Sequence, residues 1–202
     1  MKITAKMSRR EGVNLDGRDK ISRILAKRPY APGVHGPSSR TRQTDYGKQL
    51  REKQKCRRIY GMMEKQFRNL FEEAARRKGD TGALFMKLLE SRLDNVIFRS
   101  GFAKTRAMAR QFVGHAMFDV NGVKVNIPSY RVKAGDLITV RQTKKSKGPW
   151  KELAEQLKNH QMPSWLTVDP TELSVRVTGA PTDDELKNQP FDVKPIVEFY
   201  SR

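Results

Sequence analysis

Apolar residues recur at helical spacing within the segment from residue 46 to residue 78. Ile59, Met63, Phe67, Leu70 and Ala74 follow one another at intervals of four, four, three and four residues, which places them on one face of a helix. A face of this kind predicts a helix that buries one side in a core and leaves the other side polar.

Two interruptions divide this part of the chain. Gly61 lies inside the apolar pattern, and a glycine there costs about 1 kcal/mol relative to alanine, so we expect a bend or close packing at this position. The stretch "KGDTGA" then ends the segment, and a second apolar group predicts another helix before residue 91: Leu84, Phe85, Leu88 and Leu89.

The pattern changes at residue 91, where two short helices are predicted. Ser91 with Asp94 three residues later has the spacing of a capping box, and Thr105 is the expected cap of the second helix. Arg106 and Arg110 are four residues apart and should share one outward side. The expected inward faces are Leu93, Val96 and Ile97 in the first helix and Ala107, Met108, Phe112 and Val113 in the second.

Short strands follow the two helices. Asn121-Gly122 lies between β-forming residues in "FDVNGVKVN", which is the strongest local signal for a two-residue hairpin turn. "GDLITVRQ" and "LSVRVTGAP" are further strand patterns, "KELAEQLKNH" (151–160) is a short helix pattern, and Thr182 with Glu185 has capping-box spacing. The fold class predicted is α+β, with a small twisted antiparallel sheet.

Residues 1–45 are expected to form a basic extended arm. Three prolines and two glycines fall in the fifteen residues of "RPYAPGVHGPSSRTR", which excludes a regular helix or a central strand there. A disordered tail is the alternative that composition leaves open.

Charge points to a polyanionic partner. The net charge is +19 and the pI about 10.3, and residues 1–60 alone hold 17 basic and five acidic residues. Such an excess favours nucleic acid first and an anionic membrane second, but no long apolar span or signal-peptide segment is present. Cys56 is the only cysteine, so an internal disulfide and a cysteine zinc site are excluded, and a reducing compartment fits best.

The stretch "YGKQLREKQKCRRIY" (46–60) is the densest basic region. It has six basic residues from Lys48 to Arg58 against one acid, Glu52. The alternative is a solvated helix face, but the neighbouring basic arm favours phosphate contact. Arg51, Lys55 and Arg58 are spaced along one side, with Arg57 beside them.

Several long stretches together resemble the bacterial and organellar family of small-subunit ribosomal protein four. They are "SRREG" (8–12), "APGVHG" (31–36), the run from "DYGKQLREKQK" to "RRKGDTG" (45–82), "SRLDNVIFRSGFAKTRAMARQFVGH" (91–115), "VNG" (120–122), "NIPSYRV" (126–132) and "IVEFYSR" (196–202). The resemblance runs nearly end to end and is weakest at 13–30 and 142–195.

The resemblance implies four parts: an arm at 1–45, a helical domain at 46–90, an inserted RNA-binding module at 91–151, and a C-terminal segment at 152–202 that packs back near the helical domain. It implies a non-enzymatic, ribosome-bound protein of the cytoplasm, or of an organelle matrix or stroma. The partners implied are 16S-type rRNA, small-subunit protein five and mRNA at its entry channel, without a membrane. It also implies nucleation of subunit-body assembly and an effect on translational accuracy.

The resemblance and the charge pattern together predict the contact residues. Tyr130 could stack on an unpaired base or pack on the module's own core, and both remain open. Arg40 and Arg42 lie where relatives face the mRNA channel. Many relatives bind zinc through four cysteines in the arm; this chain has none there, so no metal or cofactor is expected. The predicted rRNA-binding residues are Arg51, Lys55, Arg57, Arg58, Lys104, Arg106, Arg110, Tyr130, Arg131 and Lys133.

Other functional classes fit less well. "RLD" (92–94) is similar to the catalytic tripeptide of pseudouridine synthases, but Asp94 falls in the first turn of a predicted helix, where a carboxylate suits the helix dipole. A factor that rescues stalled ribosomes is a third possibility, which the long helical domain disfavours. The three histidines are far apart in sequence, and a capped helix start explains the acids Asp183, Asp184 and Glu185 without Mg²⁺.

Overall fold

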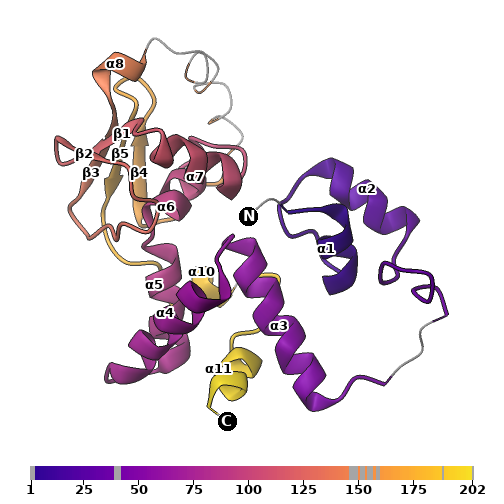
Figure 1. Ribbon diagram of the computed structural model, residues 1–202. Coiled ribbons are helices and arrows are strands. Elements are labelled where there is room, and N and C mark those ends of the chain that lie inside the picture. The colour runs from indigo at the N-terminus through magenta and orange to yellow at the C-terminus, as the bar shows by residue number, and fades with distance from the viewer. Residues whose placement is uncertain are drawn as a thin grey trace. The chain divides into compact units, whose positions relative to one another are not determined.

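The computed structural model describes residues 3–38, 42–145, 150, 153, 157, 160–187 and 189–201. The chain divides into two compact units (Figure 1). Unit 1 comprises Met1–Gly82 and Lys187–Arg202, and unit 2 comprises Ala83–Leu186. Unit 1 is helical and unit 2 contains a sheet, which confirms the predicted α+β class.

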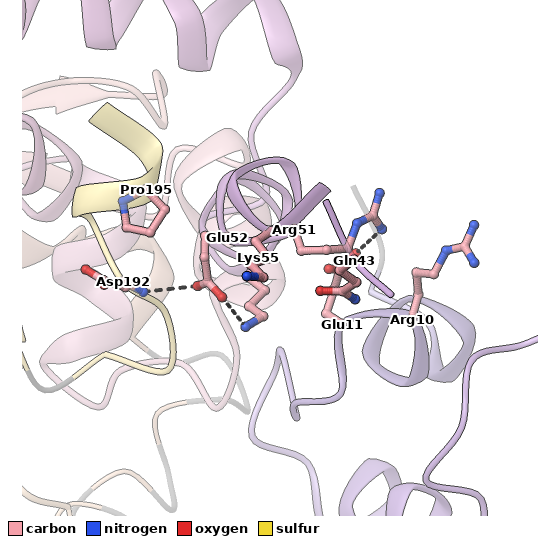
Figure 2. A pocket seen from close by; sticks show the side chains of 9 residues that line it. Arg10, Glu11, Gln43, Arg51, Glu52, Lys55, Asp192 and Pro195 are labelled. Carbon is pink, nitrogen blue, oxygen red and sulfur yellow. Dashed lines mark hydrogen bonds and ion pairs between the residues drawn. The ribbon is translucent and has the colours of Figure 1, made fainter. Parts of the chain in front are cut away.

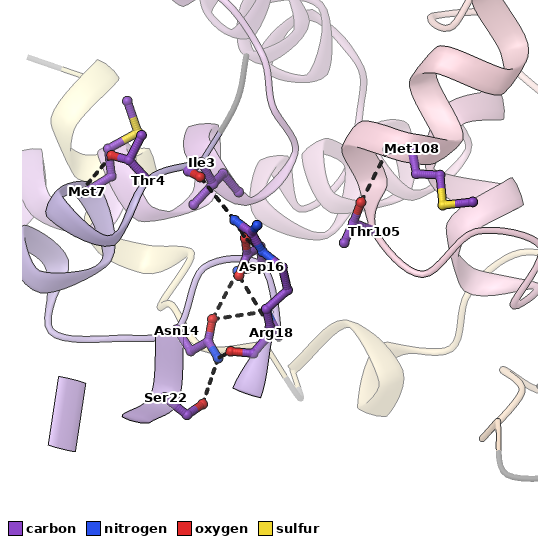
Figure 3. Close-up of polar contacts among 10 residues, drawn as sticks. Ile3, Thr4, Met7, Asn14, Asp16, Arg18, Ser22, Thr105 and Met108 are labelled. Atoms are coloured by element: carbon purple, nitrogen blue, oxygen red, sulfur yellow. Dashed lines mark hydrogen bonds and ion pairs between the residues drawn. The ribbon is translucent and has the colours of Figure 1, made fainter. Parts of the chain in front are cut away.

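Unit 1 begins with two short helices in the segment expected to be extended. They are α1 (Ala5–Glu11) and α2 (Asp19–Lys27). The Thr4 hydroxyl caps α1 by accepting from the Met7 amide, and Gly12 ends the helix at φ 73° (Figure 3). Asn14 orders the connection, because its side chain binds Ser22 Oγ at 2.8 Å and accepts from the Gly17 amide at 3.0 Å. Within residues 28–38 the chain is irregular, as its prolines predict.

The segment predicted to be largely helical over 46–78 is two helices, α3 (Asp45–Ile59) and α4 (Glu64–Arg76). Gly61 adopts φ 63° and breaks the helix rather than bending it. The break shifts the apolar face by one residue: Met62 is 1% exposed, whereas Met63, which was expected on that face, is 62% exposed. Phe67, Leu70 and Ala74 are buried as predicted.

The C-terminal helix α11 (Lys194–Tyr200) packs against α3. The Tyr200 ring stacks on Phe71 with ring centroids 4.7 Å apart, and Phe199 lies 5.5 Å from Tyr46. The Lys53 ammonium lies 4.5 Å from the centre of the Phe199 ring. These ring contacts, and the Lys53 ammonium over the Phe199 ring, therefore hold α11 against α3 and α4.

Unit 2 consists of helices around one antiparallel sheet. The helices are α5 (Thr81–Glu90), α6 (Leu93–Arg99), α7 (Arg106–Gly114), α8 (Gln142–Lys145) and α10 (Asp183–Lys187). The strands are β1 (Phe118–Val120), β2 (Val123–Val125), β3 (Leu137–Val140), β4 (Leu166–Asp169) and β5 (Ser174–Val177), in the order β2-β1-β3-β5-β4. Buried residues of α6, α7 and the strands share one core.

The predicted hairpin is confirmed between β1 and β2. Asn121 and Gly122 both have positive φ, 51° and 79°, and Val120 pairs with Val123 across the turn. Positive φ at both central residues is the type I′ geometry that matches strand twist.

The sheet extends further along the chain than residue 151. Ile138 of β3 pairs with Val175 of β5, and β4 then pairs with β5. The strand predicted in "LSVRVTGAP" is confirmed, and it lies in the sheet of unit 2. The helix expected over 151–160 falls largely outside the described residues. The domain boundaries at 45, 90 and 151 stay predictions.

Two details of the predicted helices are wrong. The Ser91 hydroxyl donates to the Leu88 carbonyl at 3.1 Å and does not cap α6, while Asp94 binds the Arg92 guanidinium at 3.0 and 2.7 Å. In α7 the predicted Phe112 and Val113 are buried, but Ala109 is buried with them whereas Ala107 is exposed. The Thr105 cap is confirmed, since its hydroxyl accepts from the Met108 amide at 3.2 Å (Figure 3).

No helix among the described residues has the length and apolar character needed to span a bilayer.

Candidate nucleic-acid interface

Arg51 and Arg58 lie on the side of α3 that faces α1, where both bind one carboxylate. Arg51 Nη1 is 3.2 Å from Glu11 Oε1 (Figure 2). Arg58 Nη1 is 2.5 Å from the same oxygen, and the Glu11 side chain is fully buried. The two arginine side chains keep 28% and 18% of their surface exposed. One acid therefore serves two cations, which leaves positive charge at this contact.

Burial governs the ionisation of this cluster. Burial raises the pKa of Glu11, although Arg51, Arg58 and the nearby Lys55 and Arg10 oppose that rise. Burial likewise lowers the pKa of Arg58, against the pull of Glu11. Glu11 Oε2 and Arg58 Nε are buried without a hydrogen-bond partner. The contact between α1 and α3 is thus polar, and two of its buried polar atoms have no hydrogen-bond partner.

Beside this cluster, unit 1 has an open pocket of about 430 Å³ (Figure 2). Its lining comes from α1, from α3 and the chain just before it, and from the first turn of α11 and the chain just before that. Lys55 binds Glu52 at 2.5 Å, and the Asp192 amide donates to the same carboxylate at 3.1 Å. The basic side chains of the pocket outnumber its acids. Its lining residues are Arg10, Glu11, Gln43, Lys48, Arg51, Glu52, Lys55, Asp192 and Pro195.

Arg57 contacts α4, whereas Arg51 and Arg58 of the same helix contact α1. The Arg57 guanidinium binds Gln54 at 2.8 Å and Glu64 at 3.3 Å, so it joins α3 to α4. The pocket also includes Arg10, which was not among the predicted rRNA-binding residues. Its position in the basic stretch "SRREG" (8–12) is the feature of the sequence that could have identified it.

In unit 2, Arg106 and Arg110 are half-buried rather than directed outward as expected. Arg106 Nε donates to Asn95 Oδ1 at 2.9 Å, and its guanidinium lies 4.4 Å from the centre of the Phe98 ring. Arg110 Nη1 is 3.7 Å from Asp94. Both arginines therefore bridge α7 to α6, while Lys104 just before α7 is exposed.

The loop at 126–133 is anchored next to the start of α6. The Leu93 amide donates to the Tyr130 carbonyl at 2.8 Å, and the Val132 amide donates to the Ser91 carbonyl at 2.9 Å. Val132 is the buried residue of this loop, whereas Tyr130 is 37% exposed. Arg131 and Lys133 are also exposed. The loop and the two arginines of α7 thus both contact the first turn of α6.

The remaining sequence predictions concern the arginines at 40 and 42, the histidines and the acids near residue 184. Arg42 is exposed, and Arg40 lies outside the described residues. His160 Nε2 is 2.7 Å from the Arg99 carbonyl, a packing role. Glu185 accepts from the amides of Thr182 and Ser164, as expected of a capped helix start. Within the described ranges no three His, Cys, Asp or Glu side chains are grouped to hold a metal ion.

Asp94 has the environment of a structural carboxylate. Its two oxygens bind the Arg92 guanidinium in a bidentate pair, and the Asp94 and Arg92 side chains are 7% and 5% exposed. A carboxylate held in this way stabilises the start of α6.

The sequence of this chain matches family models, and along nearly its whole length it matches known proteins. Residues 2–90 match the family model described as the ribosomal protein S4/S9 N-terminal domain, and residues 91–138 match the S4 domain. Small ribosomal subunit protein uS4 of Roseiflexus sp. (strain RS-1) is 50% identical over 200 residues, covering 98% of this chain and 96% of that protein. The protein of the same name from Geobacillus sp. (strain WCH70) is 49% identical over 199 residues, with the same coverage of both chains. These matches confirm the resemblance and the expectation of a ribosomal protein rather than an enzyme: the chain belongs to the family of small ribosomal subunit protein uS4.

Proposed function

We propose that this chain is a structural constituent of the small ribosomal subunit that binds 16S-type rRNA through two basic surfaces. The first is the α3 surface, formed by Arg10, Arg51, Lys55 and Arg58. The second is the module surface, formed by Lys104, Arg106, Arg110, Tyr130, Arg131 and Lys133. The observation that carries the proposal is that the arginines of α7 and the loop at 126–133 both contact the first turn of α6, within the matched S4 domain.

The chemistry of these surfaces suits folded RNA. An A-form helix hides its major groove from side chains, so proteins recognise its phosphates, 2′-hydroxyls and shape. Arginines held at a helix edge supply charge at fixed positions, and the exposed Tyr130 ring could stack on an unpaired base.

The family resemblance supports finer roles. We include in the proposal primary rRNA binding that nucleates assembly of the subunit body, contact with small-subunit protein five, and an influence on translational accuracy. Arg40 and Arg42 would face the mRNA entry channel, and the protein would act bound to the ribosome, in the cytoplasm or in an organelle. No metal or cofactor is needed for these roles.

The module surface is tested by replacing Arg106 and Arg110 with alanine together. Alanine is preferable to glutamate because a carboxylate at position 110 would face Asp94. Since each hydrogen bond to a charged group contributes about 1.5–3 kcal/mol, the two arginines together contribute about 3–6 kcal/mol, and we expect affinity for a 5′-domain rRNA fragment to fall by about 100-fold to 20,000-fold. Filter binding at fixed salt measures this loss.

The matched control replaces two arginines of unit 1 for which we propose no RNA contact. Arg68 and Arg77 are exposed on or next to α4 and pair with Glu72 and Glu73, so the double alanine variant removes the same charge. It should weaken binding much less. Equal losses of affinity in both variants would mean that the arginines of the module act only through their net charge. Unchanged affinity in the module variant would mean that these arginines do not contact the RNA.

A further inference from the structure

A chain of buried polar groups links α5 to Arg106. Glu90, the last residue of α5, is 1% exposed and accepts from Asn95 Nδ2 at 2.7 Å. The same carboxylate binds Arg99 at 3.0 and 2.9 Å. Asn95 is also 1% exposed, and its carbonyl oxygen accepts from Arg106 Nε at 2.9 Å.

The chemistry of the three groups fixes the orientation of the asparagine amide. An ionised carboxylate can only accept hydrogen bonds, and a guanidinium can only donate them. The Asn95 amino group must therefore point to Glu90 and its oxygen to Arg106. The opposite orientation would set two acceptors against each other at one end and two donors at the other.

Phe98 completes the support of Arg106. The guanidinium lies over this ring at 4.4 Å while Asn95 holds Nε. Fixing an arginine side chain costs rotamer entropy, and a side chain already ordered in the free protein does not incur that cost again on binding. The support thus prepares Arg106 for a ligand.

We propose that Asn95 and Glu90 are positioning residues for Arg106, which they orient for contact with an RNA phosphate. This inference rests on the proposed function of the module surface. Neither residue need touch RNA, because both act through the arginine. The competing explanation is that the same contacts only hold α5, α6 and α7 together.

A double-mutant cycle separates the two explanations. Affinity for the 5′-domain rRNA fragment is measured for Asn95→Ala, Arg106→Ala and the double variant. Asn95→Ala alone should weaken binding about 3- to 10-fold, as expected for a coupling of about 1 kcal/mol. In the Arg106→Ala background the same change should have no effect. The control background is Arg110→Ala, in which Asn95→Ala should keep its full effect.

The outcomes distinguish the inference from the function on which it rests. If Asn95→Ala weakens binding equally with and without Arg106, the residue is merely structural and the positioning role is wrong. If Arg106→Ala itself leaves affinity unchanged, the proposed RNA contact of Arg106 fails and the positioning role fails with it. Should Asn95→Ala not fold, as judged by thermal unfolding, Phe98→Leu replaces it in the same cycle, with the same two deciding outcomes.

Discussion

Glu11 and Glu64 are carboxylates of unit 1 whose pKa values move in opposite directions. Burial raises the pKa of Glu11 more than its arginines lower it. Burial also acts to raise the pKa of Glu64, but the hydrogen bond and charge of Lys53, with the Tyr200 hydroxyl and Arg57, lower it overall. Titration of Glu11 therefore removes stability as pH rises through its raised pKa, whereas titration of Glu64 removes stability as pH falls through its lowered pKa.

The Glu64 contacts predict an acid-sensitive stability of unit 1. Lys53 Nζ is 2.6 Å and the Tyr200 hydroxyl 3.0 Å from Glu64 Oε1, so this carboxylate ties α4 to α3 and α11. Because the side chain is 46% exposed and therefore screened, we expect Glu64→Gln to cost only about 1 kcal/mol at pH 7. The difference from wild type should narrow between pH 7 and pH 3, because protonation of Glu64 in acid removes the charge that glutamine lacks.

Urea unfolding followed by circular dichroism at the two pH values measures this difference. Glu72→Gln is the control, since Glu72 pairs with Arg68 on the exposed side of α4 and should contribute little at either pH. A Glu64→Gln deficit of equal size at pH 7 and pH 3 would contradict the assignment of the effect to the charged carboxylate.

At the scale of elements, local signals predicted those features that local physics decides. The Thr105 cap, the Asn121-Gly122 turn and the strand at 174–177 were all recognisable in the sequence. A bend or close packing was predicted at Gly61, but this residue has a left-handed backbone conformation, and α3 ends before it. That break is why Met62 rather than Met63 reaches the core.

Features that depend on distant residues were not predictable in this way. Helix α1 has seven residues, too few for stability alone, and it docks through Glu11 on arginines 40 and 47 positions away. The pairing of β3 with β5 and the inward turn of Arg106 onto Asn95 are likewise tertiary. The sequence predicted the basic residues of the candidate site, but not which acids and amides hold them.

The Thr105 cap gives a prediction about α7, the helix that carries Arg106 and Arg110. Thr105→Ala removes the acceptor for the Met108 amide and should cost unit 2 about 1 kcal/mol. Thr105→Ser retains the hydroxyl and should restore most of that stability. Thermal unfolding followed by the fluorescence of Trp150 and Trp165, both buried in the core of unit 2, measures the change. If serine and alanine were equally destabilising, the methyl group rather than the cap would be responsible.

At the scale of the whole molecule, charge is the property that both units share. The net charge of +19 is too large for the chain's own acids to balance, and the buried carboxylates Glu11, Glu90 and Asp94 are already paired with arginines in structural contacts. A polyanion that supplies phosphates along both surfaces would relieve this repulsion. The family membership and the two proposed basic surfaces both favour structured RNA as that polyanion.

The salt dependence of binding tests this claim most directly. Each phosphate that a basic side chain neutralises releases counterions, so log affinity should fall linearly with log salt concentration, by about 0.7–0.9 per phosphate. For the full chain and a 5′-domain rRNA fragment, we predict a loss of about 1,000-fold or more in affinity between 50 and 200 mM salt, as for proteins with several phosphate contacts. An affinity that stays constant over this range would contradict the account.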